Sequence, residues 1–243
     1  MDFNNNLFVK KIVLERNKID NFDEYPFNID VIKNLDEIRF NKNVTFLVGE
    51  NGIGKSTFIE ALAVNLGMNP EGGSQNFMFS TKNTHSNLYK YLKIPTLYKP
   101  VTKYFLRAES FYNVISEIED SGLNEFYEGF KMHECSHGES FIQLVQSRFY
   151  PRGLYILDEP EAALSPSRQM TLLCLIHDLA KNGAQFIIAT HSPILISYKD
   201  GEILDLNNNF EKVKYEDTDI YKLYKMYLDM PYDMQRRLFE EER

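Results

Sequence analysis

Residues 49–57 read GENGIGKST, and this stretch fits the pattern G-x-x-x-x-G-K-[ST] at Gly49, Gly54, Lys55 and Ser56. Glycines at these positions let backbone N–H groups turn inward and approach an anion closely. A helix that begins directly after the loop adds the partial positive charge of its N-terminus. The stretch therefore predicts a loop that binds the phosphates of a nucleotide, with Lys55 at the β- and γ-phosphates and the Ser56 hydroxyl on Mg²⁺.

The flanking sequence favours the strand–loop–helix arrangement that such a loop needs. Residues 44–48 (VTFLV) are an apolar, β-branched run that suits a buried parallel strand. Residues 57–63 (TFIEALA) have helical periodicity and consist mostly of good helix formers. We expect the loop as a whole to surround the phosphates, through Gly49, Glu50, Asn51, Gly52, Ile53, Gly54, Lys55, Ser56 and Thr57.

The rest of the chain alternates between strand and helix patterns. Apolar runs predict strands at 7–14, 38–48, 153–157 and 185–190, a strand that begins at 105, and a last strand at 202–206. Helices are predicted at 123–127, 140–149, 167–180 and 219–242, with a break at Pro231, and 68–85 is predicted to be a loop. This alternation indicates an α/β fold, in which helices cover a mainly parallel sheet.

Composition excludes several classes of protein. The hydrophobic content of 43% and the charged content of 26% are ordinary for a globular chain. No apolar run approaches the roughly 20 residues that span a bilayer, and the N-terminus lacks the features of a signal peptide. Two cysteines, Cys135 and Cys174, are too few for a disulfide framework. We therefore expect a cytoplasmic protein with no transmembrane segment of its own.

The distribution of charge leaves a nucleic-acid partner open. A net charge of −8 argues against a protein that coats nucleic acid on its own. Residues 72–108 nevertheless contain no acid, and they combine basic and aromatic side chains, which suit a polyanion. The alternative is a solvated helical face with its tyrosines packed inward. The residues concerned are Lys82, Lys90, Lys93, Lys99, Lys103, Arg107, Tyr89, Tyr91, Tyr98 and Tyr104.

Two further strands end in residues suited to a nucleotide site. Residues 154–159 (LYILDE) end in two acids, at the edge where open α/β sheets bind ligands. We expect Asp158 to hold Mg²⁺ and Glu159 to polarise the attacking water. The strand at 185–190 is followed by His191, whose imidazole suits a hydrogen bond to the γ-phosphate or to that water.

In their order and sequence these motifs resemble those of the ABC-type P-loop ATPases, and within them the compact SMC/RecF-like soluble branch. The stretches that carry the resemblance are GENGIGKST (49–57), SHGES (136–140), LYILDEPEAALSP (154–166) and IIATHSP (187–193). It covers about residues 7–206 and implies one ABC-type ATPase domain over 1–243, with N-terminal antiparallel strands. The core lobe would comprise about 1–70 and 150–210, a small inserted helical subdomain about 71–149, and a C-terminal helical segment about 215–243.

The resemblance also implies a dimer. In the family the motif at 136–140 binds the γ-phosphate of the nucleotide held by the other protomer, here through Ser136 and the Gly138 N–H. The chain departs from the usual LSGGQ at the first glycine and at the glutamine. An ATP-dependent homodimer with two ATP–Mg²⁺ between its protomers follows, and the alternative is a simple helix cap at Ser136 or Ser140.

Two family positions have alternative counterparts in this chain. The family's Q-loop glutamine would be replaced by Glu109 as a ligand of Mg²⁺ and water, or by Gln75 in the earlier loop. The aromatic residue that stacks on adenine would be Tyr25, which could equally be an ordinary core or surface tyrosine.

These features predict an ATP-hydrolysing ABC-type ATPase that drives a partner process. The main hypothesis for that process is DNA maintenance or anti-phage defence. The alternatives are the ATP-binding subunit of a membrane transporter and a non-hydrolysing switch or scaffold. The partner would be DNA or a protein. An aromatic-rich helix near the C-terminus would either dock such a partner or pack on its own core, through Tyr221, Leu223, Tyr224, Met226 and Tyr227.

Overall fold

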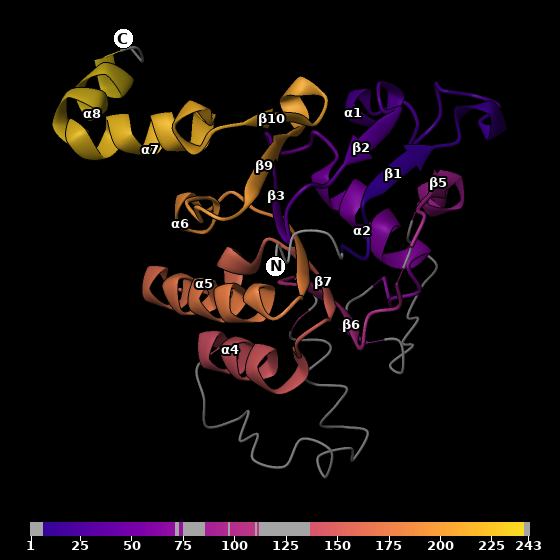
Figure 1. The fold of residues 1–243 in the computed structure, drawn as a ribbon. Coiled ribbons are helices and arrows are strands. Elements are labelled where there is room, and N and C mark those ends of the chain that lie inside the picture. The colour runs from indigo at the N-terminus through magenta and orange to yellow at the C-terminus, as the bar shows by residue number, and fades with distance from the viewer. Residues whose placement is uncertain are drawn as a thin grey trace.

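The computed structural model describes residues 7–70, 73–74, 86–96, 98–109, 111 and 137–240. A seven-stranded sheet lies at its centre, with strand order β10-β9-β3-β8-β7-β6-β4, and a three-stranded antiparallel sheet of order β2-β1-β5 lies beside it (Figure 1). The strands are β1 (Lys11–Leu14), β2 (Glu37–Arg39), β3 (Val44–Val48), β4 (Gly73–Ser74), β5 (Leu92–Lys93), β6 (Lys103–Arg107), β7 (Leu154–Asp158), β8 (Gln185–Ala189), β9 (Glu202–Asp205) and β10 (Glu211–Val213).

The larger sheet is mainly parallel, as the sequence predicts. β3 pairs in parallel with β8 and β9, and β7 pairs in parallel with β6 and β8, whereas β4 and β10 are antiparallel edge strands. The main helices are α1 (Asp30–Lys33), α2 (Lys55–Asn65), α4 (His137–Arg148), α5 (Pro166–Lys181), α6 (Pro193–Ile196), α7 (Asp219–Asp229) and α8 (Pro231–Glu240). The N-terminal antiparallel sheet expected from the family resemblance is confirmed.

The central strands are continuous apolar runs because both faces of the sheet are buried. Every residue of β3, β7 and β8 is buried. Successive side chains point to opposite faces, so Leu47 joins a core with α2 and the antiparallel sheet, while Phe46 joins a second core with α4 and α5. Figure 1 shows α4 and α5 on one side of the sheet and α2 on the other.

One strand prediction is wrong. The strand at 202–206 is not the last, because β9 ends at Asp205 and β10 follows as its antiparallel partner. The connection contains Asn209 and Phe210 in the left-handed region, with φ of 51° and 62°. The run 211–213 (EKV) is short and mostly polar, as edge strands often are, so its pattern was too weak to signal a strand.

The single strand predicted at 38–48 is also wrong, because the run forms β2 and β3, which belong to different sheets. The loop predicted at 68–85 contains the short strand β4. Other predictions of secondary structure differ only in their boundaries or lie outside the described residues. The predicted helix at 123–127 belongs to the second group, as does most of the predicted loop at 68–85. The division of the chain into core lobe, inserted subdomain and C-terminal segment stays a prediction. Within the described residues, none of the helices combines the length and the apolar character that crossing a lipid bilayer requires.

The C-terminal helices carry apolar side chains on their outer surface. Figure 1 shows α7 and α8 in yellow, extending away from the two sheets. Leu223, Tyr224, Met226 and Tyr227 are all at least 40% exposed. This exposure favours docking over packing on the chain's own core, and the docking role stays a prediction.

A buried amide connects β8 to the segment just before β1. The Gln185 side chain at the start of β8 accepts a hydrogen bond from the Val9 N–H at 2.9 Å and donates one to the Val9 carbonyl at 2.8 Å. Both residues are fully buried, at 1% and 0% exposure, so water cannot replace these bonds.

We expect Gln185→Leu to lower the free energy of unfolding by at least about 2 kcal/mol, because each buried backbone group left unpaired costs about 1–3 kcal/mol. Urea denaturation with linear extrapolation measures the change. Gln146→Leu makes the same substitution at an exposed position of α4 and should stay within about 0.5 kcal/mol of the wild type. Equal stability of the two variants would contradict the assigned role of the amide.

Candidate nucleotide site

The predicted phosphate loop connects β3 to α2, and, in the part of the chain that the structure describes, its backbone leaves the N-terminus of α2 free of a side-chain cap. Gly54, immediately before α2, has a left-handed φ of 106°. A Cβ atom there would lie 2.8 Å from Ile29 Cγ2, so only glycine fits without displacement. Among the described residues no side chain caps α2, so the first N–H groups of the helix remain available to an anion.

Lys55 is held inside the loop. Its Nζ donates hydrogen bonds to the carbonyl oxygens of Gly49 and Glu50, both at 2.8 Å. Burial lowers the pKa of Lys55, and the negative charges of Glu159, Asp158 and Glu161 act in the opposite direction. Acids more than 100 positions away along the sequence therefore lie close to the loop lysine.

Ser56 and Asp158 place two oxygen atoms that can bind a metal ion close together. The Ser56 hydroxyl donates to Asp158 Oδ1 at 3.4 Å, and the Asp158 side chain is only 4% exposed. Burial raises the pKa of Asp158 to about 6, although Arg107 and Ser56 lower it; the charges of Glu159 and Glu109 raise it further. A hydroxyl and a carboxylate are hard oxygen ligands that suit Mg²⁺, which also takes phosphate oxygens and water.

Glu159 and His191 face each other at the neighbouring strand ends. His191 Nε2 lies 3.9 Å from Glu159 Oε1, and within the described residues this nitrogen is buried without a hydrogen-bond partner. Burial lowers the pKa of His191, Lys55 lowers it further and Glu159 opposes both, so the environment favours the neutral imidazole. Glu159 adopts a left-handed conformation, with φ of 48°, which is costly for a non-glycine residue and is often found at functional sites.

Glu161 is a residue of the site that the sequence reasoning missed. It lies in the short 3₁₀ helix η6 (Pro160–Ala163) and accepts hydrogen bonds from the Thr190 hydroxyl, at 2.7 Å, and from the His191 N–H. Its carboxylate therefore connects η6 to the backbone of His191. An acid two positions after the Asp-Glu pair was the only signal, and such acids are common on surfaces.

A cavity of about 750 Å³ joins these elements, a volume within the range of ligand sites. Gly49, Glu159 and His191 line it on the side of the sheet, and Leu223 and Tyr224 of α7 line it as well. The loop, the acidic strand end and the histidine therefore surround a common space, although they are far apart in sequence.

Comparison with known proteins agrees with this arrangement. A protein family described as "AAA domain, putative AbiEii toxin, Type IV TA system" matches residues 123–197. ABC transporter I family member 1 of Arabidopsis thaliana is 26% identical over 207 residues, which span 76% of this chain and 88% of the relative. The zinc import ATP-binding protein ZnuC of Vibrio cholerae is 28% identical over 181 residues, or 72% of this chain and 68% of the relative. The chain therefore has the fold of ABC-type P-loop ATPases, and its sequence is similar to their ATP-binding proteins.

Solved structures similar to this chain include both transporter and SMC proteins. The structure of cbiO1 from Clostridium perfringens, part of the ABC transporter complex cbiONQ, covers 96% of this chain and 100% of its own, with 18% identity and a TM-score of 0.46. The SMC head domain from Thermotoga maritima covers 82% of this chain and 95% of its own, with 16% identity and a TM-score of 0.44.

The other predicted site residues of the ATPase have different environments. The Tyr25 hydroxyl lies 3.4 Å from the Thr57 hydroxyl, and the Tyr25 side chain is exposed beside the first turn of α2, where it is accessible for stacking. Glu109 is exposed just after β6, and its charge acts on Asp158. Gly138, near the start of α4, packs against Arg168. Ser136 and Gln75 lie outside the described residues, and all these roles stay predictions.

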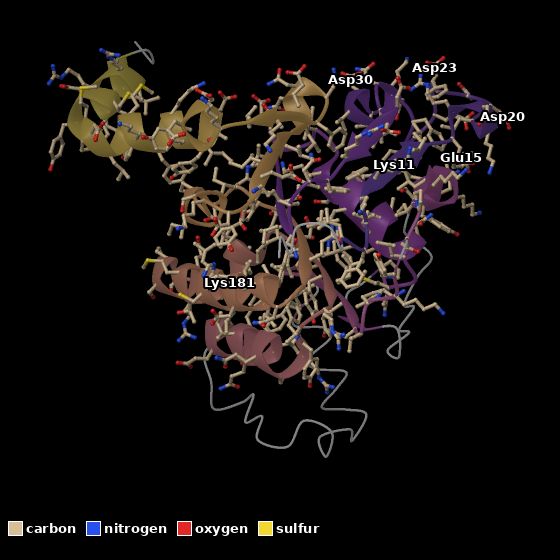
Figure 2. The ribbon with its side chains drawn as sticks, in the orientation of Figure 1. Lys11, Glu15, Asp20, Asp23, Asp30 and Lys181 are labelled. Carbon is tan, nitrogen blue, oxygen red and sulfur yellow. The ribbon has the colours of Figure 1, made fainter. Side chains whose placement is uncertain are left out.

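The basic and aromatic stretch at 72–108 is less accessible than its composition suggests. Tyr104 is buried, and Lys103 donates to the Leu66 carbonyl at 2.6 Å. Lys90 and Lys93 are exposed, but β5 pairs with β1, and the acids Glu15, Asp20 and Asp23 are labelled in the same part of the molecule (Figure 2). The burial of Tyr104 fits the alternative of tyrosines packed inward, and binding of a polyanion stays a prediction.

We expect Gly54→Ala to weaken nucleotide binding by at least about 10-fold, because a methyl group there must displace Ile29 as well as adopt an unfavourable φ. Titration with a fluorescent ATP analogue measures the affinity. Gly52→Ala is the matched control: its φ of 82° is also left-handed, but a Cβ there meets nothing within 4 Å. A loss that is equal in both variants would show that the contact with Ile29 is unimportant.

Proposed function

We propose that this ABC-type ATPase hydrolyses ATP bound with Mg²⁺, as a dimer that encloses two nucleotides. The observation that carries the proposal is that Glu159 and His191 lie 3.9 Å apart in a cavity that the loop residue Gly49 also lines. Lys55 lies close enough to Glu159 for the two charges to interact. Phosphoryl transfer requires mainly positioning and electrostatic stabilisation, and these residues supply both.

Each residue has a distinct role in the proposal. Lys55 and the amides of the loop bind the phosphates, and Ser56 and Asp158 bind Mg²⁺, with Glu109 nearby. Mg²⁺ would neutralise charge on the β- and γ-phosphates. Glu159 accepts a proton from the attacking water, and neutral His191 hydrogen-bonds the γ-phosphate. Tyr25 stacks on adenine.

The dimer follows from the family resemblance and fits one feature of the structure. In the family the turn after the two acids contacts the partner subunit. Here Ala162, Ala163, Leu164 and Ser165 match that turn. It directly follows Glu161, which is bonded to the Thr190 hydroxyl and to the His191 N–H. A partner that moves η6 would therefore act directly on the backbone of the γ-phosphate sensor. Ser136 and Gly138 would complete the partner's nucleotide site.

The comparisons favour a membrane transporter as the partner more than DNA. The curated relatives include the zinc importer's ATP-binding protein and the energy-coupling factor transporter ATP-binding protein EcfA of Methanosphaera stadtmanae, at 28% and 23% identity. We propose that the chain is an ATP-binding subunit that acts with a separate membrane protein. Co-purification of a membrane protein with the tagged chain from detergent extracts would support this function.

A role in DNA maintenance or anti-phage defence is the second candidate. The matching family carries a toxin description, and the exposed Lys90, Lys93 and Lys99 offer some positive charge. ATP-dependent, salt-sensitive binding of DNA would favour this candidate, and no binding at low salt would count against it.

We expect Glu159→Gln to lower kcat by at least about 100-fold while ATP still binds, because an amide cannot accept the proton. Phosphate release measures turnover, and steady release by the wild type also excludes a non-hydrolysing switch. Glu211→Gln, at an exposed position on β10, should keep wild-type turnover. Wild-type turnover in Glu159→Gln would disprove the role of Glu159 as the base.

The same Glu159→Gln variant should accumulate as a dimer when ATP and Mg²⁺ are present, because the enclosed nucleotide is not consumed. Light scattering after size-exclusion chromatography gives the mass, with ADP as the control nucleotide. A monomer under every nucleotide condition would contradict the enclosed-nucleotide dimer without affecting the assignment of the base.

A further inference from the structure

Arg107 bridges two acids beside the predicted metal position. It is the last residue of β6 and lies opposite Asp158 in the pairing with β7. Its Nε donates to Asp158 Oδ2 at 3.2 Å, and its Nη1 donates to Glu60 Oε2 at 3.1 Å. Glu60 belongs to α2, so one guanidinium connects β6, β7 and the helix that follows the phosphate loop.

The three charged groups are shielded from solvent. The side chains of Arg107, Glu60 and Asp158 are 23%, 16% and 4% exposed. Charged groups at this depth need a partner, and a guanidinium stays protonated at every physiological pH. Arg107 therefore supplies a permanent positive charge to Asp158 when no metal ion is bound.

Asp158 is thus shared between an arginine and the predicted metal site. Its Oδ2 accepts from Arg107, whereas its Oδ1 lies 3.4 Å from the Ser56 hydroxyl. Glu159 and Glu109 also act electrostatically on Asp158. Without the arginine, a group of acids would surround the metal position, and such a group would attract divalent cations even before a nucleotide arrives.

We propose that Arg107 is a built-in counter-ion for Asp158 that makes binding of the divalent cation depend on the nucleotide. The inference deepens the proposed function and rests on it. With Arg107 present, Glu60, Arg107 and Asp158 have a net charge of −1 instead of −2, so the nucleotide-free site attracts Mg²⁺ weakly. The phosphates of ATP then provide the remaining negative charge and oxygen ligands. The metal therefore enters with the nucleotide.

A purely structural role for Arg107 makes a different prediction. If Arg107 only held β6, β7 and α2 together, the role would require the shape and hydrogen bonds of arginine. Every substitution would then have a similar effect. A counter-ion requires only the charge. Arg107→Lys keeps the charge, Arg107→Met removes it at similar length, and Arg107→Gln removes it while keeping hydrogen-bond donors. Glu60→Gln removes a negative charge, so it makes the group of Glu60, Arg107 and Asp158 less negative, whereas loss of Arg107 makes it more negative.

The test measures binding of Mn²⁺, as a probe for Mg²⁺, to nucleotide-free full-length protein by electron paramagnetic resonance. We expect weak binding to the wild type and to Arg107→Lys. Binding to Arg107→Met and Arg107→Gln should be at least about 10-fold tighter, and binding to Glu60→Gln should be weaker than to the wild type. ATP should reduce the differences among the variants. Circular dichroism checks folding, and Arg107→Gln keeps the test valid if Arg107→Met does not fold.

Two results would overturn the inference. One is unchanged or weaker Mn²⁺ binding in the neutral variants, and the other is an equal change in Arg107→Lys. Binding of a fluorescent ATP analogue in EDTA separates this failure from failure of the proposed function. A wild type that binds no nucleotide contradicts the proposed function, whereas nucleotide binding together with unchanged Mn²⁺ affinity contradicts only the role of Arg107.

Discussion

Parallel pairing of β3, β8, β7 and β6 is the constraint on which the rest of the site depends. Parallel strands end at the same edge of a sheet, so the segments that follow them meet in space. The pairs Asp158–Ala189 and Arg107–Asp158 set the register at that edge. The pairing itself is held by apolar side chains on both faces of the sheet, which is why β3, β7 and β8 are mainly apolar.

Charge is the second constraint, because the sheet edge collects more acids than cations. Asp158, Glu159 and Glu161 all lie close enough to act on Lys55. The structure compensates locally: Lys55 bonds the loop carbonyls, Arg107 pairs with Asp158, and Thr190 donates to Glu161. Each buried acid thus has a hydrogen-bond donor, as burial of charge requires. A nucleotide and its metal ion would enter a site whose buried acids are already hydrogen-bonded, although its net charge is still negative.

The motifs of the site could be predicted because each combines a local pattern with a chemical requirement. The loop at 49–57 needs glycines and a lysine at definite spacing, and Asp158, Glu159 and His191 follow apolar strands. Arg107 and Glu60 had no such signal. Arg107 lies in a basic stretch that suggested binding of nucleic acid, and Glu60 lies on the face of a predicted helix. Their pairing joins positions 47 residues apart and depends on how α2 packs on the sheet.

The sequence by itself determined the fold class, the order of the nucleotide motifs and the strand ends at which they lie, because backbone pattern and residue chemistry are encoded locally. Only the tertiary structure decided which charges meet. It turned Arg107 inward to Asp158, connected Glu161 to the backbone of His191, and left the apolar side chains of α7 and α8 exposed. The physical reason is that ion pairs and burial depend on the packing of distant segments, which no short stretch of sequence specifies.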